Sequence, residues 1–181
     1  MNPQWFALQV YSGREKWIAA QLAKSAFPIL LPLTKQVRKW SDRTKVLLIP
    51  LFPGYLFCHM DIRQRHELAA KGLGVLRIVG CGNEPEPVPD AEIESLQKLV
   101  ESGRLLEPWP YIAGGAEVRI SGGALHGVVG TFVEVKKNRR IVVSVNPLQR
   151  SVAVELDSES VSLFRMDLPA VSMSADHLAH Q

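Results

Sequence analysis

Aromatic side chains in one short segment are the residues of this chain whose spacing points most directly to chemistry, and that chemistry is binding. Phe52, Tyr55 and Phe57 fall within the segment LFPGYLF. In a strand, with its two-residue period, Tyr55 and Phe57 lie on one face and Leu56 on the other. Exposed aromatic rings rimmed by basic groups are typical of a protein-docking surface. The alternative is that these rings are covered, either by the C-terminal part of the chain or by a neighbouring hairpin.

Basic residues gather in the first part of the chain. The 181 residues include 21 Lys and Arg against 18 Asp and Glu, a net charge of +3. Residues 1–79 carry +8, residues 80–107 carry −5, and residues 108–181 are neutral. A basic region is either a solvated face or a surface for a polyanion such as nucleic acid. Trp40, in the densest basic stretch, either stacks on a base or packs beneath that stretch. The candidate nucleic-acid contacts are Arg14, Lys16, Arg38, Lys39, Trp40, Arg43 and Lys45.

No arrangement of residues predicts catalysis, a metal or a cofactor. Asp90, Glu92 and Glu94 form a carboxylate cluster, but they fall in the first turn of a predicted helix, where the helix dipole stabilises negative charge. Cys58 and Cys81 form no CxxC motif, and the five histidines lack metal-ligand spacing. No apolar run is long enough for a transmembrane helix, and the N-terminus does not read as a secretory signal. We therefore expect a cytoplasmic protein that is not an enzyme and has no metal, cofactor or membrane contact.

The elements that must position the aromatic and basic residues are those of an α+β domain. The aromatic and apolar run 5–11 predicts a buried strand, and Ser12 with Glu15 matches a capping box for a helix that ends near residue 25. A helix over 91–102 has Ile93, Leu96 and Val100 on one stripe. The other predicted elements are a hairpin with arms over 34–40 and 44–51, a strand over 55–60, a helix over 64–71 and a strand over 74–79.

The pattern changes after the last of these helices. Residues 104–116 contain two prolines and no clear period, which predicts a linker. Short runs of β-branched residues follow, separated by Gly, Asn and Pro turns, and predict a small β-barrel. The expected organisation is an N-terminal domain over 1–103, a linker over 104–116, a barrel over 117–166 and a mobile tail over 167–181.

Five segments, in order, resemble the NusG family of transcription elongation factors. They are WFALQVYSG from Trp5, LFPGYLF from Leu51, GVLRIVG from Gly74 with PVP from Pro87, GVVGTF from Gly127 and VAVEL from Val152. The resemblance implies an N-terminal antiparallel sheet flanked by helices, of the ferredoxin-like NusG type, and a C-terminal SH3-like β-barrel with a KOW motif. The stretch RKWSDRTK from Arg38, followed by PLFP, is similar to specialised paralogues of the UpxY and RfaH type.

The resemblance implies a transcription elongation and antitermination factor that suppresses pausing and termination on specific long operons, such as those for polysaccharide biosynthesis. The N-terminal domain would bind the clamp helices of RNA polymerase and the non-template DNA strand. The barrel would recruit a small-subunit ribosomal protein or Rho. The alternative function is a generic KOW-containing RNA-binding or ribosome-associated protein. The implied polymerase contacts are Phe52, Tyr55, Phe57, Trp5 and Tyr11, and the implied barrel contacts are Leu125, Val128 and Leu148.

Two alternatives concern the barrel. Leu125, Val128 and Leu148 are either partner contacts or ordinary loop and core residues.

RfaH-type proteins can convert this domain into a helical hairpin that masks the polymerase site. Residues 117–156 are rich in Val, Ile and Thr, which favour strand over helix, so we expect a constitutive barrel here.

Overall fold

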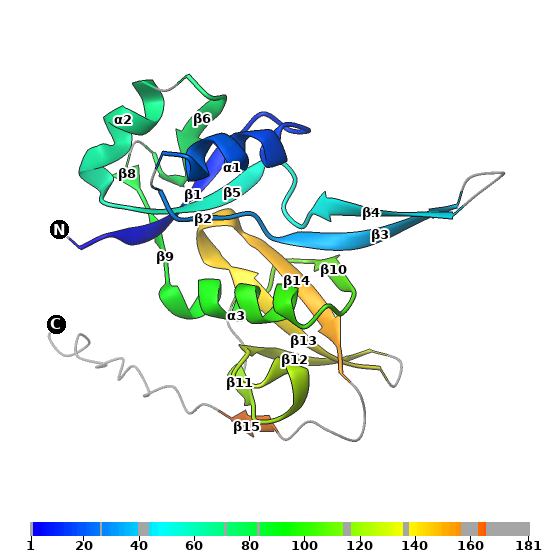
Figure 1. The fold of residues 1–181 in the computed structure, drawn as a ribbon. Coiled ribbons are helices and arrows are strands. Elements are labelled where there is room, and N and C mark those ends of the chain that lie inside the picture. The colour runs from blue at the N-terminus through cyan, green and yellow to red at the C-terminus, as the bar shows by residue number, and fades with distance from the viewer. Residues whose placement is uncertain are drawn as a thin grey trace, which may run out of the picture.

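The computed structural model describes residues 2–25, 27–39, 44–70, 72–82, 84–113, 117–135, 138–156 and 163–165. Two antiparallel sheets form the body of the protein, with a two-stranded hairpin projecting from one side (Figure 1). The mixed α/β architecture with antiparallel sheets agrees with the fold class predicted from the sequence. No helix in these ranges is long and apolar enough to cross a membrane.

The N-terminal sheet has the strand order β2-β5-β1-β6, with β9 paired to β1. In the central pair, Phe6 lies opposite Cys58 and Leu8 opposite Leu56. These side chains point to one face and form a core with helices α1 and α2, which confirms the predicted faces of both strands. The elements are β1 (Gln4–Val10), α1 (Glu15–Ala23), β2 (Ile29–Leu30), β5 (Tyr55–Met60), η1 (Ile62–Gln64), α2 (Arg65–Ala70), β6 (Val75–Ile78) and β9 (Pro87–Val88).

The hairpin of β3 (Leu33–Lys39) and β4 (Thr44–Pro50) forms a separate two-stranded sheet, as predicted. Val37 lies opposite Val46, and both side chains are exposed. The base of the hairpin is anchored because the Thr34 hydroxyl donates to the carbonyl of Leu106 at 3.1 Å. A second small sheet, β7 (Gly80–Cys81) with β8 (Glu84–Pro85), lies in the loop that precedes β9.

The C-terminal sheet has the order β10-β14-β13-β12-β11-β15. Strands occupy most of residues 117–156, as the β-branched composition predicted. The segment predicted to be a linker contains a strand, β10, whose Leu106 pairs with Val154. Pro108 hid this strand from the sequence pattern; proline is tolerated there because β10 is at the edge of the sheet. The elements are β10 (Leu106–Trp109), β11 (Glu117–Ile120), η2 (Gly123–Leu125), β12 (Val129–Val135), β13 (Asn138–Val145), η3 (Asn146–Leu148), β14 (Arg150–Glu155) and β15 (Leu163–Arg165).

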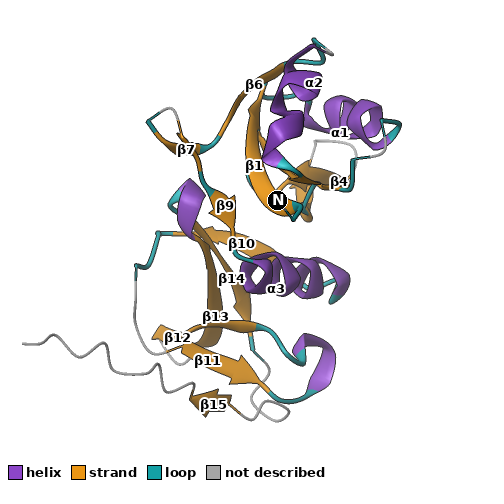
Figure 2. Cartoon of the chain, turned by 90° about the vertical axis from the view of Figure 1, so that its left-hand side faces the viewer, coloured by secondary structure: helices purple, strands orange, loops and turns teal. Residues whose placement is uncertain are grey.

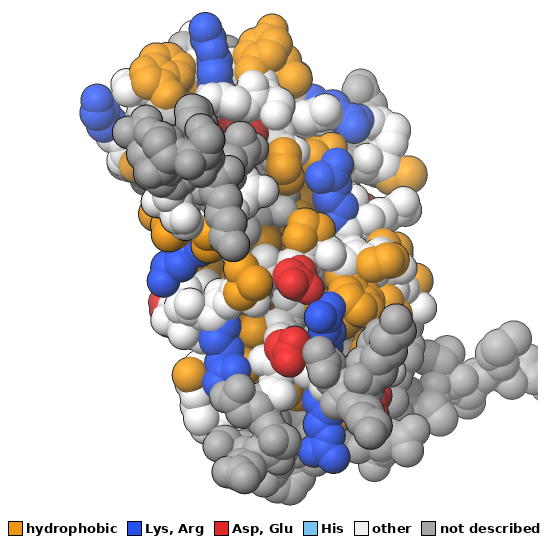
Figure 3. Space-filling model, turned by 90° about the vertical axis from the view of Figure 1, so that its right-hand side faces the viewer, with side chains coloured by type: hydrophobic (Ala, Val, Ile, Leu, Met, Phe, Trp, Pro, Cys, Tyr) orange, Lys and Arg blue, Asp and Glu red, His pale blue; other side chains and the backbone are white. Residues whose placement is uncertain are grey.

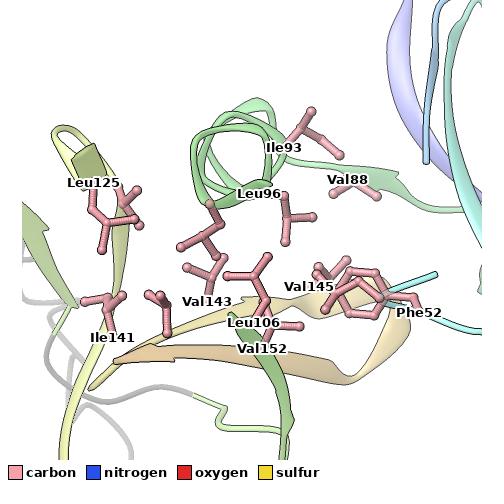
Figure 4. Packing of buried hydrophobic residues seen from close by; sticks show 14 of the residues in the cluster. Phe52, Val88, Ile93, Leu96, Leu106, Leu125, Ile141, Val143, Val145 and Val152 are labelled. Carbon is pink, nitrogen blue, oxygen red and sulfur yellow. The ribbon is translucent and has the colours of Figure 1, made fainter. Parts of the chain in front are cut away.

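Helix α3 (Asp90–Glu101) lies beside the C-terminal sheet, on the far side of the N-terminal sheet from α1 and α2 (Figures 1 and 2). Its buried stripe is Ile93, Leu96 and Leu99, whereas Val100, expected in the stripe, is only partly buried. The helix joins the two halves, because one continuous hydrophobic core runs from the N-terminal sheet past α3 into the C-terminal sheet (Figure 4).

Candidate functional site

The aromatic residues of the LFPGYLF segment meet on the face of β5 that points away from α1. Phe57 and Phe52 pack edge to face, with ring centroids 6.0 Å apart and ring planes at 86°. Tyr55 is half-buried next to them. The β5 alternation therefore places Tyr55 and Phe57 together, as the two-residue period predicted. We call Phe52, Tyr55 and Phe57 the aromatic cluster.

The expectation that the aromatic cluster is exposed is wrong in this structure. Phe52 is 2% exposed and Phe57 is fully buried. They belong to the core that also contains Val145 and Val152 of the C-terminal sheet, and Figure 4 shows Phe52 next to Val145. The alternative reading, in which the C-terminal part of the chain covers these rings, therefore describes this structure. Burial of apolar area favours this arrangement by about 25 cal/mol for each Å² removed from water.

Arg150 covers the remaining member of the aromatic cluster. Its guanidinium carbon lies 5.0 Å from the centroid of the Tyr55 ring, within the range of a cation–π contact. Arg150 follows a tight turn in which Gln149 has a left-handed backbone, with φ of 49°. This turn brings the basic side chain of β14 over the aromatic face of β5.

Trp5 and Tyr11 were predicted to belong to the same surface, and the structure separates them. Trp5 lies at the edge of the core that holds the aromatic cluster, with its ring 5.1 Å from that of His59. Tyr11 is 55% exposed and belongs to neither core. Its ring lies beside Gly74, because a Cβ on that glycine would come within 3.1 Å of it.

The turn before β5 is pinned by a buried carboxylate. Glu15 is 3% exposed and accepts a hydrogen bond from the backbone N–H of Gly54 at 2.8 Å. Burial opposes ionisation of this group, but backbone N–H groups, including those of Gly54 and Gly13, hold the pKa of Glu15 below its ordinary value. The predicted capping box is wrong, since α1 begins at Glu15 with Arg14 as N-cap and no side-chain cap. The Glu15 carboxylate instead accepts a hydrogen bond from the turn at Gly54, between Phe52 and Tyr55 of the aromatic cluster.

Helix α3 holds the C-terminal sheet through polar contacts that the sequence analysis did not predict. The Glu92 carboxylate accepts from the backbone N–H of Asn146 at 3.1 Å and from its side-chain amide at 2.7 Å. The Ser95 hydroxyl accepts from the backbone N–H of Val129 at 3.1 Å, and the Lys98 ammonium donates to the carbonyl of Gly127 at 3.3 Å. Ser95 lies beside the apolar stripe, and its burial in the structure shows that this helix face is an interface rather than a solvated surface.

Glu92 titrates near neutral pH in this environment. Burial raises its pKa to about 7, the hydrogen bonds from Asn146 oppose that rise, and the nearby carboxylates of Glu117 and Glu86 add to it. Glu92 and Glu117 both line a cavity of about 330 Å³ between α3 and the C-terminal sheet. The described ranges contain no group of three or more His, Cys, Asp or Glu side chains able to hold a metal.

The stability contribution of Glu92 is expected to depend on pH. Its pKa is higher in the folded chain than its ordinary value of 4.5, so the folded state binds this proton more tightly than the unfolded state. The contribution is therefore lost as pH rises from about 4.5 to about 7. Glu92→Gln, which cannot ionise, should lose less unfolding free energy than the parent between about pH 5 and about pH 8 in denaturant titrations. Glu94→Gln, on an exposed residue of the same helix, is the control, and equal pH dependence in parent and Glu92→Gln would contradict the prediction.

The residues predicted to form a partner surface on the barrel are not freely exposed. Leu125 is 2% exposed and Val128 is fully buried, both in the core that α3 shares with the C-terminal sheet. Leu148 is partly buried against that core. In this structure, Leu125 and Val128 are therefore core residues, as the alternative interpretation predicted.

The candidate nucleic-acid contacts fall into two places. Arg14 and Lys16 are exposed at the start of α1, and the Lys16 ammonium donates to the carbonyl of Leu48 at 2.6 Å. Lys45 is exposed on β4 of the hairpin. Two further candidates, Arg38 and Lys39, lie in β3, whereas Trp40 and Arg43 lie outside the described residues.

Comparison with known proteins identifies relatives along most of the chain. Residues 3–97 match the family profile described as "Transcription termination factor nusG". The protein named "Transcription termination/antitermination protein NusG" of Thermus thermophilus is 27% identical over 181 residues, covering 89% of this chain and 98% of that relative. The Pseudomonas aeruginosa protein of the same name is 26% identical over 174 residues, with the same coverage. The solved structure titled "Domain interaction in Thermotoga maritima NusG" superposes with a TM-score of 0.51 at 20% identity, covering 86% of this chain and 94% of that one, which supports the fold.

Proposed function

Because the chain belongs to the NusG family, whose members bear the names of transcription termination and antitermination proteins, we propose that it is a transcription elongation and antitermination factor. In this proposal its N-terminal domain binds RNA polymerase and suppresses pausing and termination. The observation that carries the proposal is the aromatic cluster. Phe52 and Phe57 lie on the side of the N-terminal sheet that its own helices α1 and α2 leave uncovered, so they are not needed for the core beneath those helices.

The proposed occupant of the aromatic cluster is the pair of clamp helices of RNA polymerase. An apolar face with aromatic anchors suits a helix that lays its own apolar side against it. Since Phe52 and Phe57 are buried by the C-terminal sheet, polymerase binding requires that sheet to move away. The C-terminal sheet and the polymerase therefore compete for one surface, and the affinity for polymerase is lowered by the free energy of the internal packing.

The C-terminal sheet is proposed to act as an SH3-like barrel with a KOW motif that recruits a second partner. The candidate partners are a small-subunit ribosomal protein or Rho, bound through Leu125, Val128 and Leu148. Two of these side chains, Leu125 and Val128, are buried in the core that α3 shares with the C-terminal sheet. We call the arrangement in which the C-terminal sheet packs on α3 and on the aromatic cluster the closed packing. The barrel surface, like the aromatic cluster, becomes available only when the closed packing loosens.

The basic residues are proposed to contact the displaced non-template strand beside the polymerase. Arg14, Lys16 and Lys45 are exposed at the start of α1 and on the hairpin. The hydrogen bond from Lys16 to the Leu48 carbonyl joins these two elements. In this proposal the protein is a specialised paralogue of the UpxY or RfaH type that serves long operons, such as those for polysaccharide biosynthesis.

Capture of purified RNA polymerase by the full-length chain tests the proposal, together with transcription in vitro on a long template with and without Rho. We expect the polymerase to be retained and the fraction of full-length transcript to rise. Retention of ribosomal RNA without polymerase would instead favour the generic KOW-type RNA-binding protein. Absence of any effect on pausing or termination would exclude the elongation role.

A further inference from the structure

A cavity of about 400 Å³ lies beside β6, the last strand in the order of the N-terminal sheet. Its walls come from helix α2, strand β6 and the turn between β7 and β8, which lie at one end of the molecule (Figures 1 and 2). The described lining residues include no member of the aromatic cluster and none of the candidate nucleic-acid contacts. Sites for small molecules are typically cavities of this size, about 300–1,000 Å³.

Apolar side chains form part of these walls. Leu68 of α2 is 2% exposed, and Val75 and Ile78 of β6 are partly buried against the core beneath the helices. Leu76 lines the same cavity and is 49% exposed. A ring or chain placed against Leu76 would remove apolar surface of both from water, which favours binding.

The turn between β7 and β8 forms a wall of fixed shape. A Cβ at Gly80 would lie 1.9 Å from the backbone carbonyl oxygen of Glu84, so the two short strands approach each other as only glycine allows. Gly82, in the turn itself, has φ of +59°, in the left-handed region that favours glycine. The fold therefore sets the positions of Gly82 and Pro85 in the wall, and a site that is formed in advance costs less free energy to occupy.

The charge in the cavity is positive. The described lining residues include Arg65 and His66 at the start of α2 and Arg77 on β6, and no Asp or Glu. The Nε–H of Arg77 donates to the side-chain carbonyl of Gln9 at 2.7 Å, which fixes the direction of this arginine and occupies one of its five N–H donors. Within the described ranges, no carboxylate forms an ion pair with Arg65 or Arg77.

Other arginines of the protein have acidic partners. Arg63 pairs with Asp61, and Arg140 pairs with Glu107. On the side of the molecule shown in Figure 3, Asp and Glu side chains likewise lie next to Lys and Arg side chains. Guanidinium groups without carboxylate partners, set in a partly apolar cavity, favour an anionic ligand with oxygen acceptors.

The number of basic groups indicates which anion. A phosphate monoester carries about two negative charges at pH 7 and matches two arginines, whereas each phosphodiester of a nucleic-acid strand carries one. We propose that this cavity binds a small organic phosphate monoester, with its phosphate held by Arg65 and Arg77 and its apolar part against Leu76. The site goes beyond the proposed function and does not depend on it.

Calorimetric titration of the full-length chain with phenyl phosphate tests this inference. The parent should bind it, and Arg65→Ala and Arg77→Ala should each weaken binding about tenfold. Arg65→Lys, which keeps the charge but loses the planar fork, should fall between Arg65→Ala and the parent. Leu76→Ala should weaken binding of phenyl phosphate and leave binding of inorganic phosphate unchanged. The matched control is Arg63→Ala, which removes an exposed arginine outside the cavity wall and should bind as the parent does.

Denaturant midpoints equal to that of the parent show that each variant is folded. No binding of phenyl phosphate by the parent, or equal binding by the parent and Arg65→Ala, would overturn the inference. Inorganic phosphate binding as tightly as phenyl phosphate would contradict the contact with Leu76 and the assigned class of ligand. If an oligodeoxynucleotide without terminal phosphates displaces phenyl phosphate, and Arg65→Ala weakens the binding of that strand, the arginines serve nucleic acid and the small-molecule site is wrong.

Discussion

Tyr55→Ala is expected to weaken the binding of RNA polymerase by about 30-fold or more, whereas Arg150→Ala is expected to strengthen it. The tyrosine ring belongs to the proposed polymerase surface, and loss of an aromatic anchor at the centre of an interface costs about 2 kcal/mol or more. Arg150 lies on the covering side, 5.0 Å above that ring. Removing it weakens the closed packing, by about 0.5–1 kcal/mol for a partly exposed cation–π contact, and leaves the polymerase surface intact.

Equilibrium binding of full-length variants to purified polymerase checks both results. Arg119→Ala, which removes an exposed arginine on β11 of the same sheet, is a matched control for the loss of charge at position 150. If Tyr55→Ala binds as tightly as the parent, the aromatic cluster is not the polymerase surface. If Arg150→Ala weakens binding, the C-terminal sheet contributes to the complex rather than competing with it.

Phe57→Ala is expected to lower the free energy of unfolding by about 3–5 kcal/mol. The side chain is fully buried, packs edge to face against Phe52, and lies in the core shared by the two halves of the chain. Truncation leaves a cavity that the rigid surroundings fill only in part. Denaturant titration of the full-length chain measures the change.

Two reference variants make this result diagnostic of the closed packing. Leu56→Ala removes a fully buried residue of the core beneath α1, and should cost about 2–5 kcal/mol whether or not the two halves pack together. Leu76→Ala removes a half-exposed side chain and should change the free energy of unfolding by no more than about 0.5 kcal/mol. A Phe57→Ala cost as small as that of Leu76→Ala would mean that the aromatic cluster is not covered in solution.

Local periodicity was enough to predict which residues of β5 share a face. The alternation places Leu56 and Cys58 in the helix-side core and Phe57 on the opposite face, as the structure has them. Composition was likewise enough to favour strands over residues 117–156, because β-branched residues favour strand over helix. The strand β10 escaped prediction because its four residues pair with β14, about 45 residues later, and one of the four is a proline.

The sequence could not decide whether the aromatic cluster is exposed or covered. Whether an apolar face is exposed depends on what packs on it. Phe57 shares its core with Val145 and Val152 of the C-terminal sheet, and Arg150 lies over the Tyr55 ring. The hydrogen bonding of Glu15 likewise depends on a residue far away in the chain. Its spacing from Ser12 indicated a helix cap, but its carboxylate accepts a hydrogen bond from the backbone N–H of Gly54, 39 residues away.

The sequence by itself therefore determined the classes of element, the faces of the main strands and the family. These depend on patterns that repeat over a few residues and on short motifs. Only the tertiary structure decided that the aromatic cluster and the predicted partner residues Leu125 and Val128 are buried within one core, while Trp17 and Tyr11 stay in solvent. That division depends on contacts between distant segments, because the burial of a side chain is a property of every surface that reaches it and not of its own neighbours in the chain.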